Sequence, residues 1–182
     1  METLAEQLGT TAHISPLLMK ARGLGLREPV DLERLAIDRG CRYYDPAIEG
    51  ASSRETRLSV SKNDFSNNEL ALALLSISMP KSQRRLRMGA AMLAAEGNQA
   101  EEIVRIARME RCDLVVRHIA ICGAVVEPEN DFWKLILEEL PKVEPKPWVL
   151  PHITRFVAMT GVTRRGTETI MQWIRPTPEL LA

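Results

Sequence analysis

The chain has 182 residues, a formal net charge of zero, and a composition that is 45% hydrophobic but only 4% aromatic. A chain of this length usually forms one domain, or one domain with a small appendage. Zero net charge excludes a global electrostatic attraction to nucleic acid or to membrane surfaces. The aliphatic composition, rich in leucine and alanine, favours helices over sheets.

The first residues lack the basic and apolar regions of a secretory signal peptide, so we expect a cytoplasmic protein. The longest apolar stretch, residues 114–126, contains Arg117 and His118 and is too short to span a bilayer. The three cysteines form no C-x-x-C motif, which predicts reduced thiols without a disulfide framework or a metal site. No glycine-rich phosphate loop is present, so no cofactor is expected.

Residues 1–65 are predicted to form an irregular N-terminal segment that contains short helices and a linker. One short helix is expected at residues 15–23, where serine and proline occupy the cap and the first helical position. A second is expected at residues 32–39, with Pro29 and Asp31 opening it and a glycine after its end. Residues 51–64 show little apolar periodicity and predict a loop or a poorly ordered linker.

Residues 66–182 are predicted to form a helical-repeat domain. Ser66 and Glu69 have the spacing of a capping box, which predicts a helix that begins there and ends before Pro80. Four further helices are expected from their caps and apolar faces, at about residues 82–96, 98–111, 113–126 and 130–140. The short connections between these helices predict that neighbouring helices run antiparallel.

The C-terminal part begins with four prolines in residues 141–151, which predict an extended and stiff connector. Two final helices are expected after it, at about residues 151–160 and 167–174. Residues 156–173 have the general appearance of a DNA-reading helix-turn-helix, but the distance from Gly161 to Trp173 is too long for that motif. We therefore interpret the middle of this stretch as a loop that joins the two final helices.

One short phrase occurs three times in the chain, at residues 86–91, 116–121 and 154–159. Each copy has an arginine, two further residues, an alanine and then an apolar residue. The arginines of the first two copies lie thirty residues apart, and those of the last two lie thirty-eight apart. Intervals of this size are typical of helical repeat arrays.

Paired helices that carry Val-Arg-x-x-Ala in the second helix resemble the HEAT-repeat family, especially its short bacterial form. The resemblance covers about residues 66–162 and is sharpest at residues 113–120. It implies an all-α fold, a short α-solenoid of stacked antiparallel helical hairpins that follows the irregular helical N-terminal segment.

The resemblance also implies a structural role for the repeated arginines. In this family an aspartate shortly before the arginine contributes to a ladder of charged hydrogen bonds between successive repeats. Asp113 and Arg117 fit that pattern fully, whereas Gln83 and Pro151 stand where the other two copies would need an aspartate. The ladder implied for this chain consists of Arg87, Asp113, Arg117 and Arg155.

The family is a binding architecture, so we predict a non-enzymatic scaffold or adaptor whose partner is another protein. Nucleic-acid binding through an arginine-rich face is the first alternative. A DNA glycosylase-type enzyme is the second, because some DNA glycosylases resemble HEAT stacks. Terminal repeats must cover an apolar face, so a homodimer formed through a terminal helix is also considered.

The candidate binding surface is a basic face formed by two helices, suited to phosphate or to an acidic peptide. Its alternative is an ordinary solvated face, in which Glu101 pairs with the arginine four residues later. The candidate residues are Arg84, Arg85, Arg105, Arg108 and Arg111, to which the nucleic-acid alternative adds Arg164 and Arg165.

Three smaller features complete the candidates. An enzyme of the glycosylase type would need aromatic and acidic neighbours, and only Trp133 and Asp131 provide them within the array. His118 and Cys122 are spaced for one helix face, but without further ligands we interpret them as core residues rather than a metal site. Trp148, between prolines, is either an exposed anchor for a partner or a packing residue, and both readings stay open.

Overall fold

The computed structural model describes residues 2–42, 60–143, 148–160 and 170–177. Within these residues the chain forms eight α-helices, one 3-10 turn and two short strands. The protein is therefore mostly helical, as the composition predicts. Arg164, Arg165 and most of the linker expected at residues 51–64 lie outside the described residues.

Three short helices form the N-terminal part: α1 (Leu4–Leu8), α2 (Pro16–Gly23) and α3 (Pro29–Asp38). The predictions for α2 and α3 are confirmed, whereas α1 is an addition that its capping box at Thr3 and Glu6 could have indicated. The fully buried Glu110 holds the start of α2, because it accepts hydrogen bonds from Ser15 Oγ at 2.5 Å and from the Leu17 amide at 2.8 Å.

The five helices predicted from residue 66 onward are confirmed. They are α5 (Asn67–Leu74), α6 (Gln83–Leu93), α7 (Ala100–Met109), α8 (Asp113–Val126) and α9 (Asp131–Glu139). Ser66 and Glu69 form the expected capping box, and Ser82 and Asn130 accept backbone hydrogen bonds at the starts of α6 and α9. These caps satisfy amides that would otherwise have no partner, which fixes where each helix begins.

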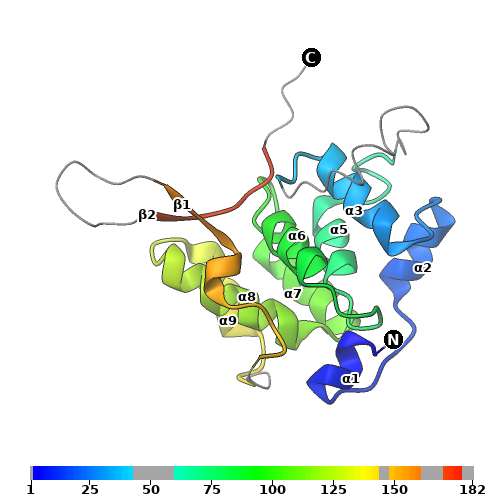
Figure 1. Ribbon diagram of the computed structural model, residues 1–182, viewed down its shortest axis with the longest axis horizontal. Coiled ribbons are helices and arrows are strands. Elements are labelled where there is room, and N and C mark those ends of the chain that lie inside the picture. Colours follow the sequence, from blue (N-terminus) through cyan, green and yellow to red (C-terminus); the bar gives the residue numbers. More distant parts are fainter. Residues whose placement is uncertain (1, 43–59, 144–147, 161–169, 178–182) are drawn as a thin grey trace.

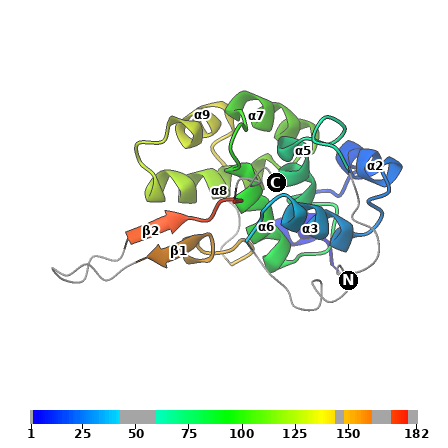
Figure 2. The ribbon, with the colours of Figure 1, turned by 90° about the horizontal axis from the view of Figure 1, so that it is seen from above.

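Two glycines allow close contacts between these helices. A Cβ atom at Gly89 in α6 would lie 2.6 Å from Leu75 Cδ2, at the end of α5. A Cβ atom at Gly123 in α8 would overlap the indole ring of Trp133 in α9. In Figure 2, α7 and α9 lie along one side of the helical part of the molecule, and α3 and α6 lie along the opposite side.

The prediction of two final helices, at residues 151–160 and 167–174, is wrong. A 3-10 turn, η1 (Ile153–Arg155), leads instead into strand β1 (Val157–Thr160), and strand β2 (Ile170–Trp173) pairs with β1 in antiparallel register. Val157 lies opposite Trp173, and Met159 lies opposite Met171. Figure 1 shows both strands extending away from the helices, on the side opposite α2 and α3.

The strand pair is attached to the core through one large buried side chain at its base, that of Trp173. Trp173 is 2% exposed and lies among aromatic rings of other elements, with ring-centre distances of 5.0 Å to Trp133 and 5.4 Å to Phe156. Its indole nitrogen donates to the carbonyl of Ala90 in α6 at 3.3 Å. This burial stabilises an extended backbone at the base of the pair, which outweighs the local helix preference.

The C-terminal segment continues across the helices after β2. Arg175 forms two hydrogen bonds with the carboxylate of Glu127, at 2.5 and 2.6 Å, and the Thr177 amide donates to the carbonyl of Gly40 at 2.8 Å. Buried apolar residues from Leu4 to Trp173 belong to one core cluster. The domain boundary predicted near residue 65 stays a prediction.

None of the helices in the described ranges is long and apolar enough to cross a membrane.

Candidate functional site

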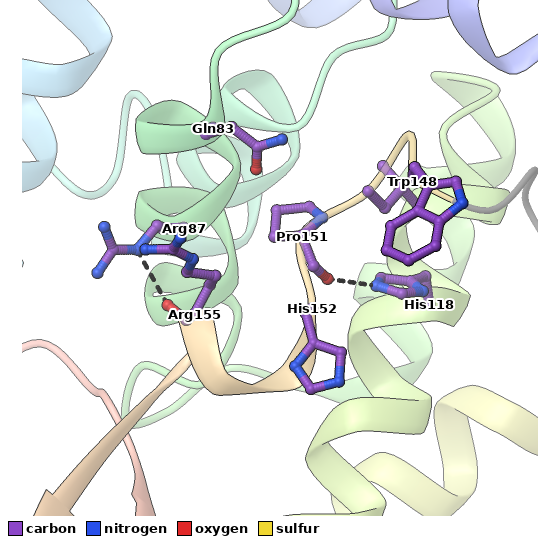
Figure 3. A pocket seen from close by; sticks show the side chains of 8 residues that line it. Gln83, Arg87, His118, Trp148, Pro151, His152 and Arg155 are labelled. Carbon is purple, nitrogen blue, oxygen red and sulfur yellow. Dashed lines mark hydrogen bonds between the residues drawn. The ribbon is translucent and has the colours of Figure 1, made fainter.

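A cleft with a volume of about 600 Å³ lies between α6, α8 and the segment from Trp148 to Arg155 (Figure 3). Three parts of the chain that are far apart in sequence meet there. The described lining residues are mainly cationic, polar or aromatic, and they are Gln83, Arg87, His118, Trp148, Leu150, Pro151, His152 and Arg155.

The local structure explains how these side chains reach the cleft. Gln83 and Arg87 are four residues apart on α6, so they project from the same helix face. Trp148 has a positive φ of 71° and its side chain is 94% exposed, so the ring is not a packing residue. Of the two readings left open from the sequence, this exposure favours an anchor for a partner.

Two hydrogen bonds attach the segment to both helices. His118 Nε2 lies 2.8 Å from the carbonyl oxygen of Pro151, and Arg87 Nε donates to the carbonyl oxygen of Arg155 at 3.0 Å. A carbonyl oxygen can only accept, so His118 carries its proton on Nε2. The segment is therefore fixed to α8 at one end and to α6 at the other.

All three copies of the repeated phrase contribute to this cleft. Arg87 comes from the first copy, His118 from the second and Arg155 from the third. The sequence interpretation gave Arg87 and Arg155 a structural role, and it considered His118 only as a core residue or metal ligand. The structure brings these three residues together, a convergence that repeats alone could not reveal because it depends on the path of residues 148–155.

The ladder implied by the HEAT resemblance differs from the observed contacts. Arg117 Nη1 donates to the carbonyls of Leu137 and Leu140 at 3.1 and 3.2 Å, rather than to Asp113, among the residues that the structure describes. These carbonyls lie at the end of α9, where helix carbonyls have no partner within the helix. Arg117 thus connects α8 to α9 through backbone acceptors.

The predicted basic face is not a continuous surface of arginines. The two arginines on α6, Arg84 and Arg85, are the first evidence for this. Arg85 is only 6% exposed and donates to the carbonyl of Pro80. Burial lowers the pKa of Arg85, and the charge of Glu33 partly offsets this effect. Arg84 lies 2.9 Å from Glu33 Oε2. Neither arginine is presented as an open cation.

The arginines of α7 also have acidic neighbours. Arg105 forms two hydrogen bonds with Glu102, at 2.6 and 2.8 Å, and this contact lowers the pKa of the glutamate. Arg108 lies 3.5 Å from the carboxylate of Glu139 in α9. Arg111 is exposed after the end of α7, with a positive φ of 54°. The five candidates are therefore separated, and four of them are buried or lie beside a carboxylate.

The residues named for a glycosylase-type enzyme are not placed for such chemistry. Trp133 is fully buried, and its ring is 4.9 Å from that of Phe132 and 5.0 Å from that of Trp173. Asp131 is an exposed residue at the start of α9, 3.2 Å from Lys134. A fully buried indole cannot contact a base in a surface groove.

The pair formed by His118 and Cys122 does not resemble a metal site. Cys122 Sγ lies 3.9 Å from His118 Nε2, and burial raises the pKa of this thiol to about 11. Thiolate is the form that binds metals, so burial disfavours coordination. In the described ranges, no three histidine, cysteine or acidic side chains are grouped to hold a metal ion.

Comparison of the chain with protein-family models, with characterised proteins and with solved structures finds no match. The HEAT-like resemblance of residues 66–162 therefore stays a prediction from the sequence.

Proposed function

We propose that this protein is a non-enzymatic interaction module that binds a segment of a partner protein in the cleft between α6, α8 and residues 148–155. The observation that carries this proposal is the 94% exposure of Trp148 at a cleft of about 600 Å³. Tryptophan is among the residues that contribute most to protein–protein binding energy.

The dimensions of the cleft are consistent with this partner. Its volume is within the range of sites that hold small ligands or a few side chains of a peptide. It is fixed on two helices by the carbonyl contacts of Pro151 and Arg155, so little ordering of the protein is needed on binding. A pre-formed cleft with an aromatic residue at its edge suits a short extended segment.

Nucleic-acid binding receives less support from the described residues. A nucleic-acid surface needs several cations that face the phosphates together. Arg84, Arg105 and Arg108 each lie beside a carboxylate, which reduces the positive potential that they can offer. A protein partner is therefore the better proposal.

We also propose that α5 to α9 form a short stack of helical hairpins of the HEAT-like kind, and that the protein acts in the cytoplasm. The short connections between these helices support the first proposal. The three cysteines, all buried and free, support the second, because such thiols persist in a reducing compartment.

The test is selection from a library of random peptides displayed on phage, followed by affinity measurement with labelled selected peptides. We expect Trp148→Ala to weaken these peptides by about tenfold or more. Ile14→Ala is the matched control, because Ile14 is an 80% exposed apolar residue that does not line the cleft, and it should change affinity by less than about twofold.

Two outcomes would contradict the proposal. One is a set of selected peptides whose affinity is the same for the parent and for Trp148→Ala. The other is tight binding of labelled DNA or RNA that decreases steeply with salt and is unaffected by Trp148→Ala, which would favour the nucleic-acid alternative.

A further inference from the structure

A second, smaller pocket lies between α2, α3 and residues 78–80, and none of its described lining residues belongs to the cleft. Its volume is about 190 Å³, which is below the range of about 300–1,000 Å³ that holds whole small molecules. The buried side chains of Leu26, Leu32 and Met79 give it an apolar lining. A pocket of this size and character suits a single apolar side chain.

The backbone around this pocket is held in place on both sides. On one side, the carbonyl of Met79 accepts a hydrogen bond from the Leu4 amide at 3.0 Å. On the other, Asp31 Oδ2 accepts from the amides of Arg27 and Glu28, at 3.0 and 2.8 Å. The walls are therefore formed before a ligand arrives, so little ordering of the protein is needed on binding.

Two exposed arginines, Arg22 and Arg27, also line the pocket. Within the described part of the chain, neither side chain forms an ion pair or a hydrogen bond, whereas Arg84 and Arg105 lie beside carboxylates. One carboxylate is present in the lining, that of Glu28, which immediately precedes α3, where the helix dipole favours negative charge. The pocket thus carries a net positive charge next to an apolar lining.

The size of the pocket indicates that its ligand carries the anion and the apolar group on the same residue. In an extended segment the next side chain points to the opposite face, and the one after it lies about 6–7 Å further along the chain. The pocket has room for one side chain, and the arginines line that same pocket. A C-terminal residue meets both conditions, because its carboxylate and its side chain are attached to one Cα atom.

We infer that the pocket binds the C-terminal residue of a partner protein. The apolar side chain of that residue, about the size of leucine, lies against Leu26, Leu32 and Met79. Its carboxylate lies beside Arg22 and Arg27, whose planar groups form paired hydrogen bonds with two oxygens. This contact is separate from the function proposed for the cleft, and either can hold without the other.

Three small probes separate the effect of the side chain from that of the charge: N-acetyl-leucine, N-acetyl-leucinamide and N-acetylglycine. Each is titrated into the full ¹⁵N-labelled chain, and affinity is measured from shifts of the Leu26, Arg27 and Met79 amide signals. N-acetyl-leucine should bind with a dissociation constant on the order of millimolar, as its size allows. The leucinamide lacks the charge and the glycine derivative lacks the side chain, so both should bind about fivefold or more weakly.

Charge-removing variants test the two arginines. Arg22 and Arg27 are exposed, so the double variant Arg22→Gln/Arg27→Gln should fold, and its thermal midpoint checks this. It should bind N-acetyl-leucine about fivefold or more weakly and leave the affinity for N-acetyl-leucinamide unchanged. Arg111→Gln is the matched control, an exposed arginine that does not line this pocket, and it should leave both affinities unchanged.

A short peptide that ends in leucine identifies the source of the carboxylate. With a free C-terminus it should bind at least as tightly as N-acetyl-leucine, and its amidated form should bind more weakly. Binding of N-acetyl-leucine but not of the free peptide would assign a free small carboxylic acid and overturn the partner protein.

Three further results would overturn the inference: no probe shifts the pocket signals, N-acetyl-leucinamide binds as tightly as N-acetyl-leucine, or the double variant keeps full affinity. None of these results bears on the cleft, whose reporter is the Trp148 indole signal. That signal should stay in place throughout the titrations, because Trp148 does not line this pocket.

Discussion

Glu127 shows how a single residue can join three parts of the chain. It follows α8, and its carboxylate accepts hydrogen bonds from Trp133 in α9 at 2.8 Å, from Asn130 at 2.9 Å and from Arg175 in the C-terminal segment. Burial acts to raise the pKa of Glu127, but the hydrogen bonds from Arg175, Trp133 and Asn130, with the charge of Arg175, lower it to about 2. Sequence spacing could not reveal this pair, because Glu127 and Arg175 meet only in the folded chain.

The lowered pKa of Glu127 predicts a loss of stability in acid. The folded-state pKa of about 2 is below the ordinary value of 4.5, so the contribution is complete above about pH 4.5 and is lost as the pH falls toward 2. Because Arg175 and Glu127 are partly exposed, we expect about 1–2 kcal/mol rather than the full value of the shift. Urea unfolding of the parent and of Glu127→Gln should show a difference at pH 6 that decreases by pH 3. A difference independent of pH would contradict this role.

The helices were predictable because their signals are local. A serine or an asparagine at the cap is a property of a few adjacent residues, and it located α2, α5, α6 and α9. The helices α7 and α8 begin without a side-chain cap, and their apolar faces located them. The strands were missed because their signal is tertiary. Residues 157–160 and 170–173 are extended since Trp173 packs against the rings of Trp133 in α9 and of Phe156, which follows η1, and neither partner is adjacent to it in sequence.

The contact between α8 and α9 predicts that a substitution at Gly123 destabilises the fold, whereas the same substitution at Gly23, outside this contact, does not. Gly123→Ala places a methyl group into the Trp133 ring, so we expect the free energy of unfolding to decrease by about 1–3 kcal/mol. Gly23→Ala is the matched control in α2, where a Cβ atom would meet nothing within 4 Å, and it should be neutral or slightly stabilising. Denaturant unfolding of the two variants measures both effects. Equal stability of the two variants would contradict the close packing.

At the scale of the whole molecule, the C-terminal segment connects elements that the sequence assigned to separate parts. After β2 it contacts Glu127 near α9, and it then reaches Gly40, which follows α3. The candidate cleft is also a product of the whole fold, because its residues come from positions 83–87, 118 and 148–155. The sequence identified three of them as parts of one phrase and flagged Trp148, but it could not show that they share a cavity.

Trp173 predicts that the strands and the helices unfold together. Its side chain is buried between α6, α9 and Phe156, so Trp173→Ala should lower the free energy of unfolding by about 3–5 kcal/mol. One core cluster includes this residue and the helices. Within each protein, parent or variant, we therefore expect the far-UV and near-UV circular dichroism signals to change at one common midpoint. Separate midpoints in the parent would show that the strands are an independent unit.

The different surroundings of the three tryptophans give the protein an intrinsic fluorescence reporter. Trp133 and Trp173 are buried with their rings 5.0 Å apart, whereas Trp148 is 94% exposed. Iodide in solution can reach only the last of these while the chain is folded, so the quenchable part of the emission belongs to the edge of the cleft. A molecule that enters the cleft will protect this emission from iodide, and loss of the fold will expose the other two indoles. Occupancy and unfolding can thus be followed separately in one unlabelled sample.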